Sequence, residues 1–312
     1  MAQASFFVTT SSLALIAPAK INLSLRILGK REDGYHEIET LMAPLSLADE
    51  IELSHAHRGV PGSITLTCSD PTLPTDAANL CVKAAHLFQT NLGIREAIAI
   101  SLLKKIPHGA GLGGGSSDAA AVLQGMNTLF NEPFVLEELL QLAAMLGSDV
   151  PFFLEAKPAW CRGRGELLSA ASPLPEWTIL LIKPPFAIAS AEAYSRLKAR
   201  SPRYFAERRN QRGEELQNDT MLLDGITIYN DLEAAVFDKY LQLPILKSWL
   251  QARPEVAAAW MSGSGSTMVA ALHHEMKTEE ISKLQNNIAT EFGKTFWIKE
   301  TTFWKTEEAK KN

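Results

Sequence analysis

The chain has 312 residues, 46% of them hydrophobic and 21% charged, with a formal net charge of −5. This composition excludes disordered and membrane classes, and the acidic balance argues against a nucleic-acid backbone as the main ligand. The three cysteines form no C-x-x-C pair, and the N-terminus has no basic residue before Lys20 and no apolar run of membrane length. We therefore expect a cytoplasmic protein without structural zinc, with no membrane or nucleic-acid partner, and long enough for two domains.

The first hundred residues predict mostly strands. Isoleucine and leucine alternate through residues 21–28, and a turn is predicted just before them at 17–20. Asp33-Gly34-Tyr35-His36 predicts a second turn. We expect strands at 13–16, 21–28, 36–43, 49–54, 63–68 and 97–103 and a helix at 79–91.

A glycine-rich loop follows, with five glycines among the seven residues 109–115. Such a backbone is free to adopt positive φ and to surround an anion with N–H groups. The apolar spacing from Ala119 to Phe130 predicts a helix behind the loop, capped by Ser116 or Ser117. A helix N-terminus that opens from glycines favours phosphate. The alternative is a plain turn between a strand and a helix.

Two named phosphate motifs are excluded. Residues 109–114 match the spacing of the dinucleotide fingerprint, but a second helix, around 136–143, follows where that motif needs a strand. Gly293-Lys294-Thr295 resembles the end of a P-loop, yet Ile288 stands where its first glycine belongs. Asp149 follows the second helix at the start of a short one. It is a candidate proton acceptor or only a helix cap.

The second half predicts a separate unit. Pro173 and Pro175 suggest a boundary, giving domains at 1–172 and 173–312. Strand, helix, strand, strand, helix, strand is the order of a ferredoxin-like sandwich. The elements expected are strands at 178–183, 256–261, 267–272 and 295–301 and helices at 190–199, 231–239, 245–251 and 279–292, with a charged surface insertion at 201–219.

Three motifs, at 18–23, 107–119 and 262–266, together resemble the GHMP kinase superfamily over most of the chain. The resemblance implies an α+β fold of two domains, with a ribosomal-S5-like N-terminal α/β domain, a C-terminal ferredoxin-like α/β sandwich and a cleft between them. It also implies ATP as phosphoryl donor, with Mg²⁺ whose ligands are unassigned. We expect a monomer or a weak homodimer.

Two further motifs, at 33–38 and 147–153, resemble the family of kinases that act on 4-diphosphocytidyl-2-C-methyl-D-erythritol. The resemblance implies a cytidine diphosphate substrate, with Lys20 and Asp149 catalytic. The implied substrate-binding residues are Asn22, Tyr35, His36, Asp149 and Tyr194. The implied ATP-binding residues are Asn79, Leu80, Lys104, Pro107, Gly109, Gly111, Leu112, Gly113, Gly114, Gly115, Ser116 and Ser117.

Alternatives remain at this point. Lys20 is otherwise an exposed lysine at a strand end, Tyr35 and His36 the tip of a hairpin, and residues 262–266 a β-turn. Another GHMP kinase, acting on mevalonate, homoserine or a sugar, would keep the glycine loop without the Gly-Tyr-His motif. A ligand sensor on the same fold would have lost Lys20 or Asp149, and both are present.

Overall fold

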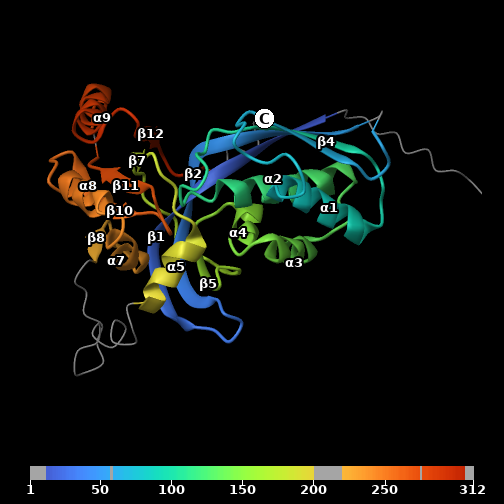
Figure 1. The fold of residues 1–312 in the computed structure, drawn as a ribbon, viewed down its shortest axis with the longest axis horizontal. Helices are drawn as coiled ribbons and strands as arrows, with labels where there is room; N and C mark the ends of the chain where they lie inside the picture. The colour runs from blue at the N-terminus through green and yellow to red at the C-terminus, as the bar shows by residue number, and fades with distance from the viewer. Residues whose placement is uncertain (1–11, 57–58, 200–219, 275, 306–312) are drawn as a thin grey trace, which may run out of the picture.

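The computed structural model describes residues 12–56, 59–199, 220–274 and 276–305. Two long antiparallel strands run through most of the molecule (Figure 1). The elements of the first half are β1 (Ser12–Lys30), β2 (His36–His55), β3 (Ile64–Cys68), α1 (Leu80–Leu92), β4 (Ile98–Leu103), α2 (Gly114–Leu129), α3 (Leu136–Leu146), α4 (Val150–Glu155), β5 (Ala159–Gly163) and β6 (Leu167–Ala170).

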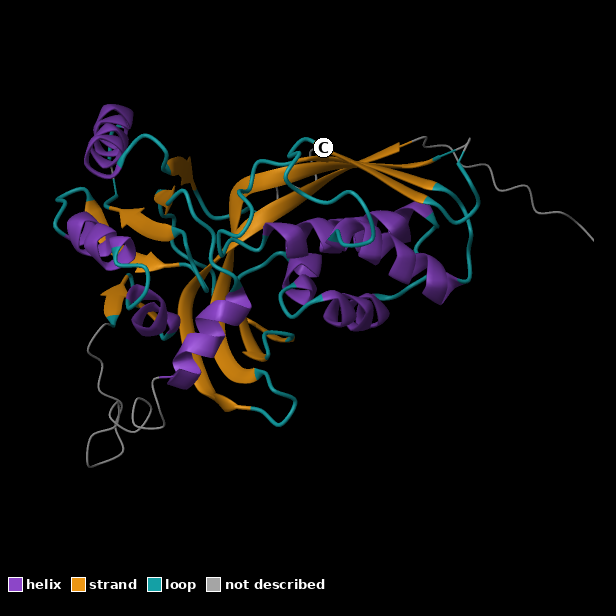
Figure 2. Cartoon of the chain, in the orientation of Figure 1, coloured by secondary structure: helices purple, strands orange, loops and turns teal. Residues whose placement is uncertain are grey.

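The first sheet has the order β3-β4-β2-β1-β9-β8, and β5 pairs with β2 and β6. Helices α1 to α4 lie on one face of its β4 end (Figure 2). Their core is rich in alanine, valine and leucine from α2, because that helix buries nearly every side chain. The glycine loop, which follows β4, thus leads directly into a largely buried helix.

The turn predicted at 17–20 was wrong, because these residues lie inside the continuous strand β1. Pro18 pairs with Ala48, and the register with β2 shifts between Pro18 and Lys20. An irregularity of this kind accommodates a residue that has no N–H to donate. The strands predicted at 36–43 and 49–54 are likewise one strand, β2.

The second half contains β7 (Ile179–Lys183), α5 (Ser190–Ala199), β8 (Met221–Leu223), β9 (Ile226–Asn230), α7 (Leu232–Phe237), α8 (Gln242–Gln251), β10 (Val256–Met261), β11 (Met268–Leu272), α9 (Thr278–Phe292) and β12 (Trp297–Thr301). The second sheet has the order β10-β11-β7-β12 and is antiparallel throughout. This is the ferredoxin-like order predicted from the sequence. The insertion predicted at 201–219 lies outside the described residues.

The two halves share a core. Leu23 of β1, Leu181 of β7 and Trp260 of β10 pack in one buried cluster. The Trp260 indole donates a hydrogen bond to the backbone oxygen of Asn22 at 2.8 Å. β9 also pairs parallel with β1, so the first sheet takes strands from both halves of the chain. The domain boundary near residue 173 stays a prediction.

Candidate active site

The glycine loop has the backbone predicted for it. Gly109, Gly111 and Gly113 all have positive φ, at 62°, 76° and 71°. A Cβ on Gly111 would lie 2.4 Å from the backbone oxygen of Ser262, so this position needs glycine. Gly113 is similarly crowded, since a Cβ there would lie 2.7 Å from the Phe153 ring, so both positions exclude a side chain.

The N-cap predicted at Ser116 or Ser117 was wrong, because α2 begins at Gly114 and its N-cap is Gly113. The Ser117 N–H donates to the Gly113 oxygen at 2.9 Å, as the first helical bond. The preceding N–H groups lie at the positive end of the helix and are available to an anion. Ser116 lines the adjoining cavity, whereas Ser117 is buried and outside the lining.

The three motifs of the superfamily meet at this loop. The Lys20 N–H donates to the Leu112 oxygen at 2.9 Å. The Ser262 hydroxyl donates to the Gly111 oxygen at 3.1 Å. The third motif is held by Asn230, whose amide donates to the Gly263 oxygen at 2.7 Å. Asn230 is thus a supporting residue with no role predicted from the sequence, and its partner lies 33 positions further along the chain.

Lys20 and Asp149 form an ion pair at 3.4 Å. The Lys20 side chain is 5% exposed and also donates to Asn22 at 2.7 Å, while the Asp149 side chain is 31% exposed. Asp149 stands at the N-cap of α4, yet its side chain makes no capping hydrogen bond. The carboxylate therefore does not cap the helix, which was the alternative role predicted for it. It lines the cavity instead.

Tyr35, His36 and Tyr194 gather at another part of the same cavity. The His36 and Tyr194 rings stack with centroids 5.2 Å apart and planes at 24°. Tyr35 is 52% exposed, and the guanidinium of Arg164 lies over its ring. Burial, and next the charge of Asp149, raises the pKa of Tyr194. The aromatic pair is therefore electrostatically close to the catalytic candidate.

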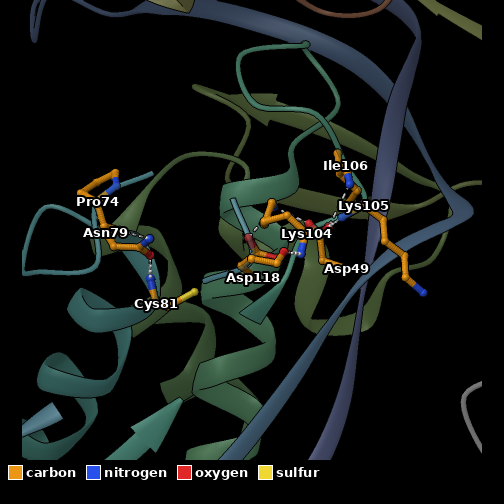
Figure 3. Close-up of polar contacts among 9 residues, drawn as sticks. Asp49, Pro74, Asn79, Cys81, Lys104, Lys105, Ile106 and Asp118 are labelled. Atoms are coloured by element: carbon orange, nitrogen blue, oxygen red, sulfur yellow. Dashed lines mark hydrogen bonds and ion pairs between the residues drawn. The ribbon is translucent and has the colours of Figure 1, made fainter. Parts of the chain in front are cut away.

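A second lysine cluster lies beside the glycine loop (Figure 3). The Lys104 ammonium donates to Asp49 and, at 2.7 Å, to Asp118. Asp49 also accepts the backbone N–H groups of Lys105 and Ile106. Burial, followed by the charge of Asp49, raises the pKa of Asp118 to about 7 against the opposing effect of Lys104. Lys104 lines the cavity, but its charge is already matched by protein carboxylates.

Asn79 is built into the start of α1. Its side-chain oxygen accepts the Cys81 N–H at 2.9 Å, and its amide donates to the Pro74 oxygen at 2.8 Å (Figure 3). Asn79 and Leu80 both line the cavity, and their predicted role in ATP binding stays a prediction.

One cavity of about 760 Å³ brings together every predicted site residue except Ser117. The sequence missed several other lining residues, which include Arg164, Ser190 and Ser264. The Ser190 and Ser264 hydroxyls are hydrogen-bonded at 3.0 Å, across more than seventy positions of chain. Two of them offered a signal: Ser264 lies in the 262–266 motif, and Arg164 lies in the polar stretch 163–166 between two glycines.

The family described as GHMP kinases N terminal domain matches residues 79–157. The 4-diphosphocytidyl-2-C-methyl-D-erythritol kinase of Methylacidiphilum infernorum (isolate V4) is 44% identical, over 86% of this chain and 88% of its own. The kinase of the same name from Protochlamydia amoebophila (strain UWE25) is 40% identical over 82% of this chain and 83% of its own. This chain belongs to the 4-diphosphocytidyl-2-C-methyl-D-erythritol kinase family.

Solved structures agree with this membership. A crystal structure of 4-(cytidine 5'-diphospho)-2C-methyl-D-erythritol kinase matches 94% of this chain and 100% of its own, with a TM-score of 0.70 and 32% identity. A mevalonate kinase aligns with a TM-score of 0.64 at 12% identity, over 93% of this chain and 99% of its own, and shows the fold alone. As a member of this kinase family, the chain uses ATP as phosphoryl donor.

The described residues lack two further features. No helix there is long and apolar enough to span a bilayer. Nor does that part of the chain gather three or more histidine, cysteine or acidic side chains at a spacing suited to a metal ion.

Proposed function

We propose that this kinase transfers the γ-phosphoryl group of ATP to the 2-hydroxyl of 4-diphosphocytidyl-2-C-methyl-D-erythritol, a step of non-mevalonate isoprenoid precursor biosynthesis. The observation that supports it most is the shared cavity of about 760 Å³, which joins the glycine loop, the Lys20–Asp149 pair and the aromatic cluster. A phosphate site, a proton acceptor and a base-stacking site are the three requirements of this reaction.

In this proposal Asp149 accepts the proton of the attacking hydroxyl. Lys20, 3.4 Å away, stabilises the carboxylate in its ionised form and then the charge that develops on the transferred group. Asn22 fixes the Lys20 ammonium, and its own amide donates to Thr40 at 2.8 Å. These two hydrogen bonds hold the ammonium beside Asp149.

The glycine loop and the first turn of α2 hold the phosphates of ATP in this proposal. Three glycines with positive φ line the cavity, and a backbone of this kind can present N–H groups to an anion without side chains in the way. Asn79, Leu80 and Lys104 line the same part of the cavity and would contact the adenosine. Mg²⁺ would be held by the phosphates of ATP and by water, since it commonly keeps several waters and few protein ligands, and the described residues gather no set of three acidic, histidine or cysteine side chains for it.

Tyr35, His36 and Tyr194 would bind the cytosine. Rings supply a stacking surface, and a neutral histidine has one donor and one acceptor for the edge of the base. Because His36 already stacks on Tyr194 in the free protein, the base would enter against this pair and Tyr35.

A coupled assay of ADP release tests the proposal. The purified protein is supplied with Mg²⁺, ATP and either the cytidine diphosphate substrate, mevalonate or homoserine. We expect turnover with the first alone. Turnover with mevalonate or homoserine at a comparable kcat/KM would assign the site to another GHMP kinase activity instead.

A further inference from the structure

Three lysine or arginine side chains line the cavity within the described residues, namely Lys20, Lys104 and Arg164. Both lysines already have protein partners. Lys20 pairs with Asp149 and donates to Asn22, and Lys104 pairs with two aspartates. Arg164 differs from both. Its guanidinium lies 3.7 Å from Glu166 through Nε, as an ion pair, and no hydrogen bond joins it to the described residues. It therefore keeps donors for a ligand.

Arg164 lies between the two ends of the acceptor site. Its guanidinium carbon is 4.8 Å from the centroid of the Tyr35 ring. The next residue, Gly165, faces the catalytic candidate, because a Cβ built there would lie 3.6 Å from Asp149 Oδ1. The turn that contains Arg164 and Gly165 thus adjoins both the aromatic cluster and the carboxylate proposed to receive the proton.

The turn that carries Arg164 is fixed by its own contacts. The Gly165 N–H donates to the Arg162 oxygen at 3.0 Å, and the Arg164 N–H donates to Glu166 at 2.7 Å. Gly163 and Gly165 both have positive φ, at 72° and 125°. The side chain between them is 28% exposed, so it is accessible to a bound molecule.

We propose that Arg164 binds the diphosphate of the acceptor substrate. This inference rests on the function proposed above, in which the base lies at the aromatic cluster and the reacting hydroxyl at Asp149. The diphosphate joins these two parts of the substrate and must lie between them, where Arg164 is. The planar guanidinium offers paired N–H donors that fit phosphate oxygens, and its 3.7 Å contact with Glu166 is longer than a hydrogen bond and leaves those donors unused.

The test compares Arg164→Gln, Arg164→Lys and the matched control Arg162→Gln. Arg162 comes from the same turn, but its side chain is 52% exposed, pairs with Glu39 at 2.9 Å and does not line the cavity. In Arg164→Gln we expect KM for the cytidine diphosphate substrate to rise roughly 10- to 100-fold, the usual range for a lost hydrogen bond to a charged group. KM for ATP should stay unchanged. Arg164→Lys should fall between, and Arg162→Gln should match the parent.

Calorimetric titration with cytidine and with cytidine diphosphate (CDP) separates binding of the diphosphate from support of the Tyr35 ring. We expect Arg164→Gln to lose affinity for CDP and to keep that for cytidine. Equal losses for both ligands, or no loss for either, would overturn the inference while leaving the proposed function intact. A parent protein that neither binds CDP nor turns over the substrate would refute the proposed function and this inference with it.

Discussion

Two lysine–aspartate clusters border the same cavity, and they are built in opposite ways. In the first, Lys20 lies 3.4 Å from Asp149, whose side chain is 31% exposed. In the second, Lys104 lies between Asp49 and Asp118, and the three side chains are at most 8% exposed. The Asp149 carboxylate pairs with Lys20 and makes no capping hydrogen bond. The second pair serves a lysine and two backbone N–H groups.

This difference suits the first cluster to catalysis and the second to stabilising the fold. A carboxylate that accepts a proton during turnover must be accessible and must gain or lose that proton without unfolding its surroundings. Asp149 meets this condition, because its side chain caps nothing. Asp49 does not, because its carboxylate satisfies backbone groups that would otherwise be buried without partners. We therefore expect substitutions in the first cluster to change rates and those in the second to change stability.

The largest effect is expected from Asp149→Asn. An amide cannot accept the substrate proton, so kcat should fall about 10²–10⁴-fold, the usual contribution of general-base catalysis. The melting temperature should stay near that of the parent. Steady-state ADP release and a thermal melt measure the two quantities. A kcat within a few-fold of the parent would place the base elsewhere.

Asp49→Ala tests the other cluster. It removes the acceptor of the Lys105 and Ile106 N–H groups and one of the two partners of Lys104. Breaking a buried ion pair by removing one partner typically costs about 3–5 kcal/mol of unfolding free energy. Urea unfolding gives this value. Unchanged stability with a large loss of kcat would mean that Asp49 serves catalysis and that the second cluster does not have a mainly structural role.

Tyr35→Ala tests a part of the cavity that belongs to neither lysine–aspartate cluster. Loss of a stacked ring is worth about 1–3 kcal/mol per base, so KM for the cytidine substrate should rise roughly 5- to 150-fold. KM for ATP should not change, because the ATP phosphates are expected at the glycine loop. Tyr35→Phe, which keeps the ring, is the control. An equal rise in both KM values would show that the hairpin does not bind cytidine.

The smallest effect is expected from Asp118→Asn, and it depends on pH. Burial raises the pKa of Asp118 to about 7 in the folded protein, and Lys104, Asp49 and Cys81 are the ionisable groups that face it. Between the unfolded pKa and this value the folded chain holds a proton that the unfolded chain has released. The stability of the parent therefore falls as the pH rises through that interval.

The variant has no such proton to lose. Its melting temperature relative to the parent should therefore increase between about pH 5 and about pH 8. Any constant cost of the amide beside Lys104 cancels when the two pH values are compared. Parallel pH profiles for parent and variant would show that Asp118 does not titrate in this range.

The sequence by itself predicted the features that depend on neighbours in the chain. The helical period behind the glycines gave α2, and the strand and helix order of the second half gave its ferredoxin-like sheet. Glycines allow the backbone to adopt positive φ, and Gly109, Gly111 and Gly113 do adopt it. Such features follow from backbone freedom and from the spacing of apolar residues, which act over a few positions.

Only the tertiary structure decided what distant segments do to one another. Lys104 acquires its carboxylates from β2 and α2, and Asn230 holds a loop that lies more than thirty positions further on. Pro18 continues a strand instead of turning, because β2 pairs with β1 on both sides of it. Arg164 reaches Tyr35 because β5 pairs with β2 beside the hairpin that carries the tyrosine. These contacts depend on sheet register and packing, and local patterns in the sequence contain neither.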